Sequence, residues 1–97
     1  MKHCATPRFW RCYQGVPEDV RDLADRNYEL LKSDPTHRSL HLEKIGQYWS
    51  VRIGRSHRAL AVEAGSDLVW FWLGSHAEYD RLVGRQAAQK ARRKTRH

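Results

Sequence analysis

Three apolar segments follow one another in the second half of the chain, and two short glycine-containing turns separate them. The segments are residues 48–53, 57–63 and 68–73. The first alternates apolar and polar side chains, as a strand with one buried face does, and the third is almost wholly apolar, as a strand covered on both faces is. Strands joined by such tight turns pair antiparallel. The pattern therefore predicts an antiparallel sheet.

A helix is predicted upstream of these strands, over residues 17–33. Apolar side chains recur there at three- and four-residue steps, and a proline follows the last of them. Before this helix, the aromatic-rich residues 8–13 are interpreted as a short first strand. A further helix is predicted to begin near Ala77, with Ser75 as its cap. The predicted order is β-α-β-β-β-α.

The basic charge of the chain is concentrated at its C-terminal end. There are 18 Lys and Arg residues against 11 Asp and Glu residues, a formal net charge of +7. The last fourteen residues hold six of these bases and no acid, which leaves the rest of the chain at +1. We therefore expect one domain over residues 1–83 and a basic, flexible tail over residues 84–97. Within the domain, residues 36–62 are cationic and residues 17–34 acidic.

Several classes of protein are disfavoured by what the sequence lacks. Cys4 and Cys12 have neither a CxxC nor a Cys/His metal spacing, so we expect two reduced thiols. The N-terminus leads into no apolar run, and no segment approaches the roughly 18 apolar residues of a membrane span, which predicts a cytoplasmic protein. The six histidines are scattered and there is no glycine-rich phosphate loop, so we expect neither a metal nor another cofactor.

The candidate catalytic groups lie in and around the predicted sheet. Arg52 and Arg58 flank a short turn, so a hairpin brings them within reach of each other. Two arginines on rigid strands suit a phosphate that gains charge in a transition state. Glu43 precedes the hairpin, His76 follows the last strand, and Tyr79 opens the last helix. Such groups can move protons. Together they suit RNA cleavage without a metal, in which one group deprotonates the 2′-hydroxyl and another protonates the leaving oxygen.

The remaining cations of this region form the predicted RNA-binding surface: Lys44, Arg55 and His57, together with Arg52. A plainer interpretation applies to each candidate, since isolated charges on strands and turns are usually only solvated. Tyr79 also shares a helical face with Leu82 and Val83, which suits ordinary packing.

Three segments stand out further: residues 48–54, 57–60 and 70–80, the last of which contains Gly-Ser-His-x-x-Tyr-Asp. In combination they resemble the RelE/ParE toxin superfamily, and more narrowly a branch with this C-terminal signature. The resemblance implies a RelE-like α+β fold. Its sheet is small and antiparallel with a mixed edge, and it carries an N-terminal helix or helical hairpin and a short C-terminal helix. It also implies the toxin of a type II toxin–antitoxin pair with a cognate antitoxin.

The resemblance carries roles onto particular residues. The arginine that opens the penultimate strand in RelE-like members matches Arg58, and a cation on the preceding strand matches Arg52. The residue after the last strand matches His76. A tyrosine near the last helix matches Tyr79 loosely, and a catalytic glutamate of other members matches Glu43.

Three activities stay open at this point. RelE-like members bind the ribosome and cut mRNA, which would make this chain an endoribonuclease with ribosome and mRNA as partners. ParE-like members share the fold but inhibit DNA gyrase. A non-catalytic binding module with a toxin fold is the third. Some RelE-like nucleases carry paired lysines on the first hairpin strand, whereas the position two before Arg52 is Ser50 in this chain.

Overall fold

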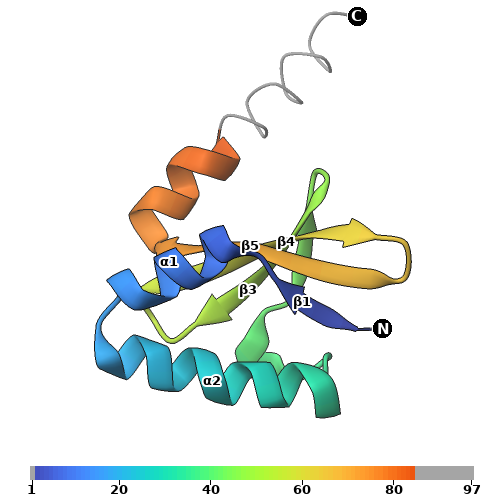
Figure 1. The fold of residues 1–97 in the computed structure, drawn as a ribbon, viewed down its shortest axis with the longest axis horizontal. Coiled ribbons are helices and arrows are strands. Elements are labelled where there is room, and N and C mark those ends of the chain that lie inside the picture. The colour runs from blue at the N-terminus through green and yellow to red at the C-terminus, as the bar shows by residue number, and fades with distance from the viewer. Residues whose placement is uncertain (1, 85–97) are drawn as a thin grey trace, which may run out of the picture.

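The computed structural model describes residues 2–84 (Figure 1). Its strands are β1 (His3–Ala5), β2 (Glu43–Ile45), β3 (Tyr48–Ile53), β4 (His57–Ala64) and β5 (Asp67–Ser75). Its helices are α1 (Pro7–Gly15), α2 (Glu18–Ser33), the short 3₁₀ helix η1 (Arg38–Leu40) and a C-terminal helix over residues 76–84. The predicted α+β class is confirmed. Apart from residue 84, the predicted basic tail lies outside the described residues.

All five strands form one sheet in the order β1-β5-β4-β3-β2. Strands β2 to β5 pair antiparallel with their neighbours, as the tight turns predict. Strand β1 instead pairs parallel with β5, with His3 opposite Leu68 and Ala5 opposite Trp70. The sheet is therefore antiparallel with one mixed edge, which confirms the fold that the resemblance implies.

The first predicted strand is wrong, because residues 8–13 belong to helix α1. Thr6 caps this helix: its Oγ1 accepts a hydrogen bond from the Phe9 backbone N–H at 3.2 Å, and Pro7 takes the first helical position. A helical stripe of partly buried side chains then packs on the sheet: Phe9, Cys12 and Tyr13. The three- and four-residue spacing of these side chains favours a helix, and it outweighs the preference of aromatic residues for strands. The actual first strand, β1, contains Cys4, and neither Cys4 nor Cys12 forms a disulfide.

The other predicted elements are confirmed within one or two residues. The C-terminal helix begins with a capping box, in which the Ser75 Oγ accepts from the Glu78 backbone N–H at 3.2 Å. The Glu78 carboxylate accepts in return from the Ser75 backbone N–H and hydroxyl, and these bonds hold the pKa of Glu78 below its ordinary value. No helix within residues 2–84 is long and apolar enough to span a bilayer.

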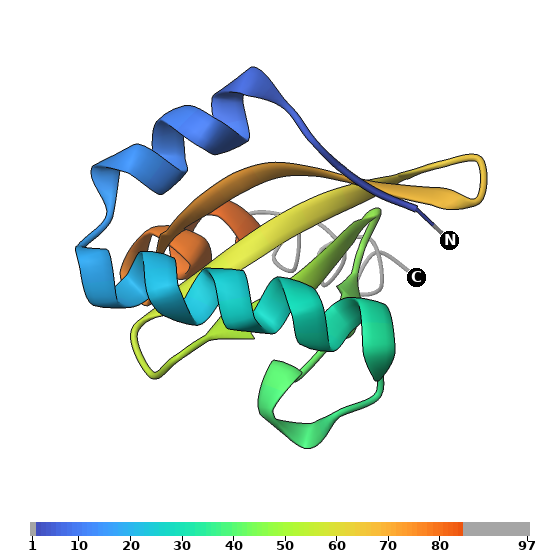
Figure 2. The ribbon, with the colours of Figure 1, turned by 60° about the horizontal axis from the view of Figure 1, so that its bottom comes forward.

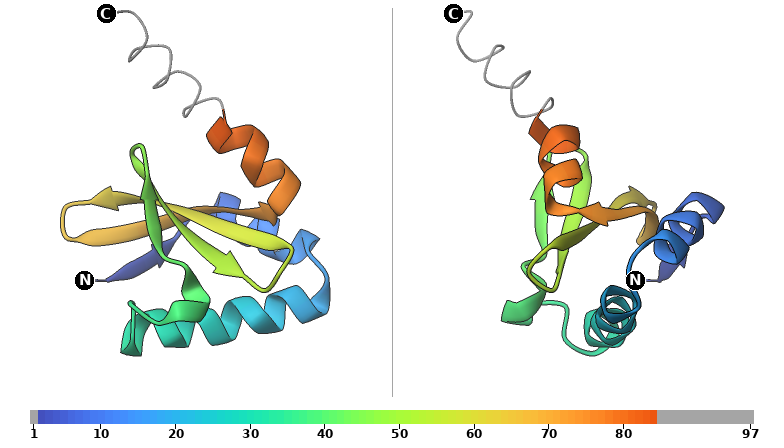
Figure 3. Two further views of the ribbon diagram at one scale, coloured as in Figure 1. Left: turned by 180° about the vertical axis from the view of Figure 1, so that it is seen from behind. Right: turned by 90° about the vertical axis from the view of Figure 1, so that its left-hand side faces the viewer.

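Helices cover both faces of the sheet (Figures 2 and 3). Helices α1 and α2 lie on one face, over a core that includes Val51 and Trp70. The C-terminal helix lies on the other face, where Tyr79 packs with Leu60 and Trp72. Strand β5 therefore contributes buried residues to both layers, which explains its almost wholly apolar sequence.

Candidate functional site

The face of the sheet beneath the C-terminal helix carries most of the predicted catalytic residues. Arg52 and Arg58 are directly opposite each other in the β3–β4 ladder, and Glu43 is opposite Ser50 in the β2–β3 ladder. Ser50 and Arg52 are two residues apart on β3. Because side chains alternate along a strand, all four belong to the same face. We call this surface the Arg58 face.

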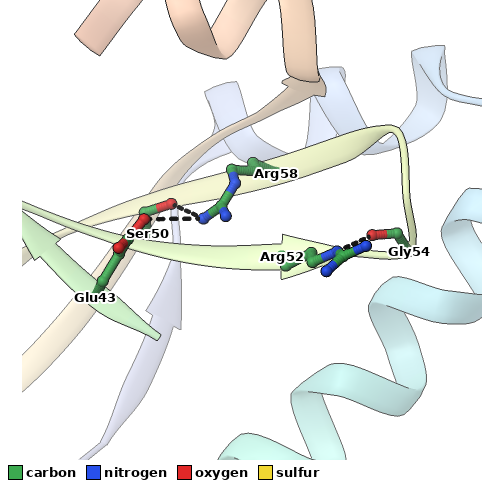
Figure 4. A network of polar contacts seen from close by, with 5 residues as sticks. All are labelled: Glu43, Ser50, Arg52, Gly54 and Arg58. Atoms are coloured by element: carbon green, nitrogen blue, oxygen red, sulfur yellow. Dashed lines mark hydrogen bonds and ion pairs between the residues drawn. The ribbon is translucent and has the colours of Figure 1, made fainter. Parts of the chain in front are cut away.

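Arg58 is held tightly on this face (Figure 4). Only 12% of its side chain is exposed. Its Nη1 donates a 2.8 Å hydrogen bond to the Ser50 Oγ and lies 3.5 Å from the Glu43 Oε1. Its Cζ lies 5.0 Å from the centre of the Tyr79 ring, which is within cation–π range. The Arg58 Nε is buried and has no hydrogen-bond partner among the described residues.

Arg52 lies across the ladder from Arg58, but its side chain turns away. Its Nε donates to the Gly54 carbonyl at 2.8 Å, and the Asn27 side chain donates to the Arg52 carbonyl at 2.6 Å. Figure 4 shows Arg58 pointing toward Ser50 and Arg52 pointing toward the β3–β4 turn. The structure thus brings the two backbones together, as a hairpin predicts, while the guanidinium groups point in different directions.

His76 and Tyr79 belong to the first turn of the C-terminal helix, and the Tyr79 ring lies against Arg58. Tyr79 is 5% exposed, and its Oη has no hydrogen-bond partner among the described residues. The His76 and Tyr79 ring centres are 6.0 Å apart. The His76 Nδ1 is 3.1 Å from the Asp80 Oδ2, and more than half of the His76 side chain is exposed. Contacts therefore run from Glu43 through Arg58 and Tyr79 to His76.

Lys44 does not join the Arg58 face. It is opposite Trp49 in the β2–β3 ladder, one residue out of phase with Glu43, so it belongs to the other face of the sheet. Its Nζ lies 3.4 Å from the Glu63 carboxylate and 5.7 Å from the Trp49 ring centre. A lysine placed in this way cannot share a ligand with Arg58 across the strand.

His57 and Arg55 lie at the turn end of the hairpin. His57 is opposite Ile53 and directly precedes Arg58, so its side chain belongs to the other face of the sheet. Its Nδ1 is 2.7 Å from the Ser56 Oγ. Arg55 is exposed in the turn between β3 and β4. These two predicted RNA-binding residues lie beyond the end of the Arg58 face.

Two residues of the site were not assigned a role from the sequence. Ser50 is fully buried beneath the Arg58 guanidinium. The sequence feature that could have identified it is its position two residues before Arg52, which places both on the same face of the predicted strand. Asp80 follows His76 by four residues, which places both on one side of a helix and marks the aspartate as a possible His76 partner.

A groove lies on the opposite side of the molecule, between α1, α2 and the sheet. It has a volume of about 260 Å³ and a mostly apolar lining. Trp10 and Tyr28 both line it, and they are 50% and 42% exposed. On its rim the Tyr13 hydroxyl donates to the Asp25 carboxylate at 2.9 Å, which raises the pKa of Tyr13.

A family profile described as ParE-like toxin domain matches residues 19–81. The chain belongs to this family. The matched range contains the whole Arg58 face and extends through His76, Tyr79 and Asp80. The site therefore lies within the part of the chain that defines it as a ParE-like toxin domain. Comparison with curated proteins gives no significant match.

Solved structures share the fold of this ParE-like domain. A YoeB/ParE toxin from Agrobacterium tumefaciens is 24% identical with a TM-score of 0.62, and the alignment covers 78% of this chain and 99% of that one. The RelB–RelE antitoxin–toxin complex from Methanococcus jannaschii gives 18% identity, a TM-score of 0.64, and coverage of 80% and 96%. A copper-bound mutant toxin from Helicobacter pylori gives 20% identity, a TM-score of 0.53, and coverage of 80% and 97%.

Proposed function

We propose that this ParE-like domain is the toxin of a toxin–antitoxin pair and that it cleaves mRNA on the ribosome. The observation that carries the proposal is the setting of Arg58. Its guanidinium is almost enclosed, it contacts the Glu43 carboxylate and the Tyr79 ring, and His76 lies next to Tyr79. An arginine flanked by groups that can exchange protons is what phosphoryl transfer without a metal requires.

The ladder position of the arginines supports a phosphate ligand. Like charges directly opposite each other on an antiparallel pair destabilise a sheet. Arg52 and Arg58 occupy such a pair. The two guanidinium groups point in different directions, so a phosphate bound at Arg58 would neutralise one charge of the pair; arginine matches phosphate in charge and in hydrogen-bond geometry.

The contacts suggest an assignment of proton transfers. The Glu43 carboxylate accepts the proton of the 2′-hydroxyl, and the 2′-oxygen attacks the adjacent phosphorus. The bond from phosphorus to the 5′-oxygen breaks, and His76 donates a proton to that leaving oxygen, which leaves a 2′,3′-cyclic phosphate. Glu43 contacts Arg58 directly, and His76 is connected to Arg58 through the Tyr79 ring; an in-line displacement would need the two groups on opposite sides of the bound phosphate. Asp80 fixes the Nδ1 of His76, so its Nε2 is available for transfer.

The decisive experiment compares Arg58→Ala with the parent in ribosome-dependent cleavage of a reporter mRNA, followed by primer extension. We expect the variant to cleave about 10²–10³-fold more slowly, the usual effect of removing one donor to a developing charge. Arg26→Ala is the matched control, because Arg26 is an exposed arginine of α2, away from the Arg58 face. Cleavage by Arg58→Ala at the parental rate would refute the proposal that Arg58 belongs to the catalytic site.

Gyrase inhibition is the competing activity, because the resemblance to the RelE/ParE superfamily implies it for ParE-like members. A supercoiling assay with purified gyrase separates the two. If the parent inhibits supercoiling and leaves the reporter mRNA intact, the function is gyrase inhibition and not mRNA cleavage. Intact supercoiling together with cleaved mRNA is the expected result.

We further propose that a cognate antitoxin covers the apolar groove with an amphipathic segment. The RelB–RelE complex, which shares this fold, contains an antitoxin. The exposed Trp10 and Tyr28 provide apolar surface that a bound helix would bury. Co-expression with the product of the adjacent reading frame should restore growth and yield a copurifying complex. Growth arrest that this product leaves unchanged would refute the pairing.

A further inference from the structure

We propose that Ser50 is a positioning residue, whose buried hydroxyl sets the orientation of the Arg58 guanidinium toward its phosphate ligand. Ser50 has no exposed surface and is a buried polar residue of the Arg58 face. It lies between Glu43 on β2 and Leu60 on β4. Burying a hydroxyl is costly unless it forms a hydrogen bond, and the bond it forms here is to Arg58.

The other contacts of Arg58 leave its orientation open. The Tyr79 ring lies against the guanidinium and restrains the tilt of its plane, but a ring face does not select one N–H over another. The Nε is without a partner among the described residues, and the half-exposed Glu43 carboxylate is 3.5 Å from Nη1. The 2.8 Å bond to Ser50 is therefore the short, directional contact that fixes rotation within the plane.

This orientation determines which nitrogen can reach a ligand. With Nε buried and Nη1 bonded to Ser50, Nη2 is the nitrogen left to a phosphate oxygen. The hydroxyl acts through Arg58 and does not itself touch RNA. Without it, Arg58 would keep its charge and its place on β4 but would sample several rotations, and the bound phosphate would meet a less ordered donor.

The kinetic test rests on the proposed function and compares Ser50→Ala with Ser50→Thr. Alanine fits the site but removes the hydrogen-bond acceptor, whereas threonine retains it. We expect Ser50→Ala to lower the single-turnover cleavage rate by about 10–10²-fold, as small misplacements of catalytic groups do. Its affinity for the mRNA-loaded ribosome should be unchanged, and Ser50→Thr should recover most of the rate. In an Arg58→Ala background, Ser50→Ala should have no further effect on the rate.

A second readout needs no activity. In ¹⁵N-labelled protein, the Arg58 guanidinium signals, identified by their loss in Arg58→Lys, should show restricted rotation in the parent and in Ser50→Thr. They should average in Ser50→Ala. Restricted rotation that persists in Ser50→Ala would overturn the inference, as would an unchanged cleavage rate in an active parent. If the parent cleaves no mRNA but Ser50→Ala still frees the guanidinium, the positioning role stands and the proposed function fails.

Discussion

Replacing Tyr79 with phenylalanine should make the domain more stable, and it tests whether the Tyr79 hydroxyl takes part in cleavage. The change removes a single oxygen atom, which is buried and has no hydrogen-bond partner among the described residues. The ring keeps its place against Leu60 and Trp72 and beneath the Arg58 guanidinium. The substitution therefore separates the hydroxyl from the packing of the side chain.

The expected size follows from the cost of burying an unpaired polar group. That cost is about 1–3 kcal/mol, and phenylalanine does not incur it. Allowing for relaxation around the site, the free energy of unfolding should rise by about 1 kcal/mol. A domain of this length then melts about 4–8 °C higher. If the hydroxyl takes part in proton transfer beside His76, mRNA cleavage should fall by about 10²-fold or more.

Urea denaturation and ribosome-dependent cleavage test the two effects separately. Tyr79→Leu is the matched control, since it removes the hydroxyl and the ring together and should lower both stability and activity. A loss of more than about 1 kcal/mol in Tyr79→Phe would show that the hydroxyl is hydrogen-bonded in solution. Cleavage at the parental rate would show that it plays no part in proton transfer.

Two further predictions concern other parts of the sheet. The Trp49 indole N–H and Lys44 hold the pKa of Glu63 below its ordinary value, so this contribution to stability is present above about pH 4.5 and is lost as the pH falls through the lower, folded value. Glu63→Gln should therefore weaken the loss of stability in acid, and identical urea midpoints for parent and variant across pH 7 to 3 would contradict this. Gly74→Ala would place a methyl group 2.8 Å from the Cη2 of the buried Trp72 and should cost about 1–3 kcal/mol by overpacking. Gly15→Ala meets no atom within 4 Å and is its control; equal melting temperatures for the two variants would show that Trp72 yields freely.

Local sequence patterns were sufficient to predict a helix or strand wherever the element is long and its apolar residues are periodic. Helix α2 and strands β3 to β5 follow from apolar spacing and from glycines at the turns, where Gly54 and Gly65 adopt positive φ angles. Helix α1 was missed because its aromatic residues favour strands, and the Thr6-Pro7 start signal received no weight. Strand β1 is only three residues long and pairs with residues far along the chain, so no local pattern marks it.

The candidate site was predictable in its backbone but not in its side chains. A hairpin places Arg52 opposite Arg58, and the sequence spacing is enough to show it. The direction of each guanidinium depends on rotamers and on what covers the face, which the spacing does not contain. Lys44 was grouped with Arg52 in one RNA-binding surface, yet Lys44 is opposite Trp49 and belongs to the other face of the sheet. Strand β2 has only three residues, so only its pairing with β3 shows which face each side chain belongs to.

The parallel pairing of β1 with β5 determines when the molecule can be completed during synthesis. His3 is synthesised 65 residues before Leu68, its partner in the ladder. At about 5–20 residues per second, the N-terminal strand waits for roughly 3–13 s. The β3–β4–β5 meander can form first because its contacts are local, whereas the edge closes last. A change in β1 should therefore slow the final step of folding without delaying the hairpin that carries Arg58.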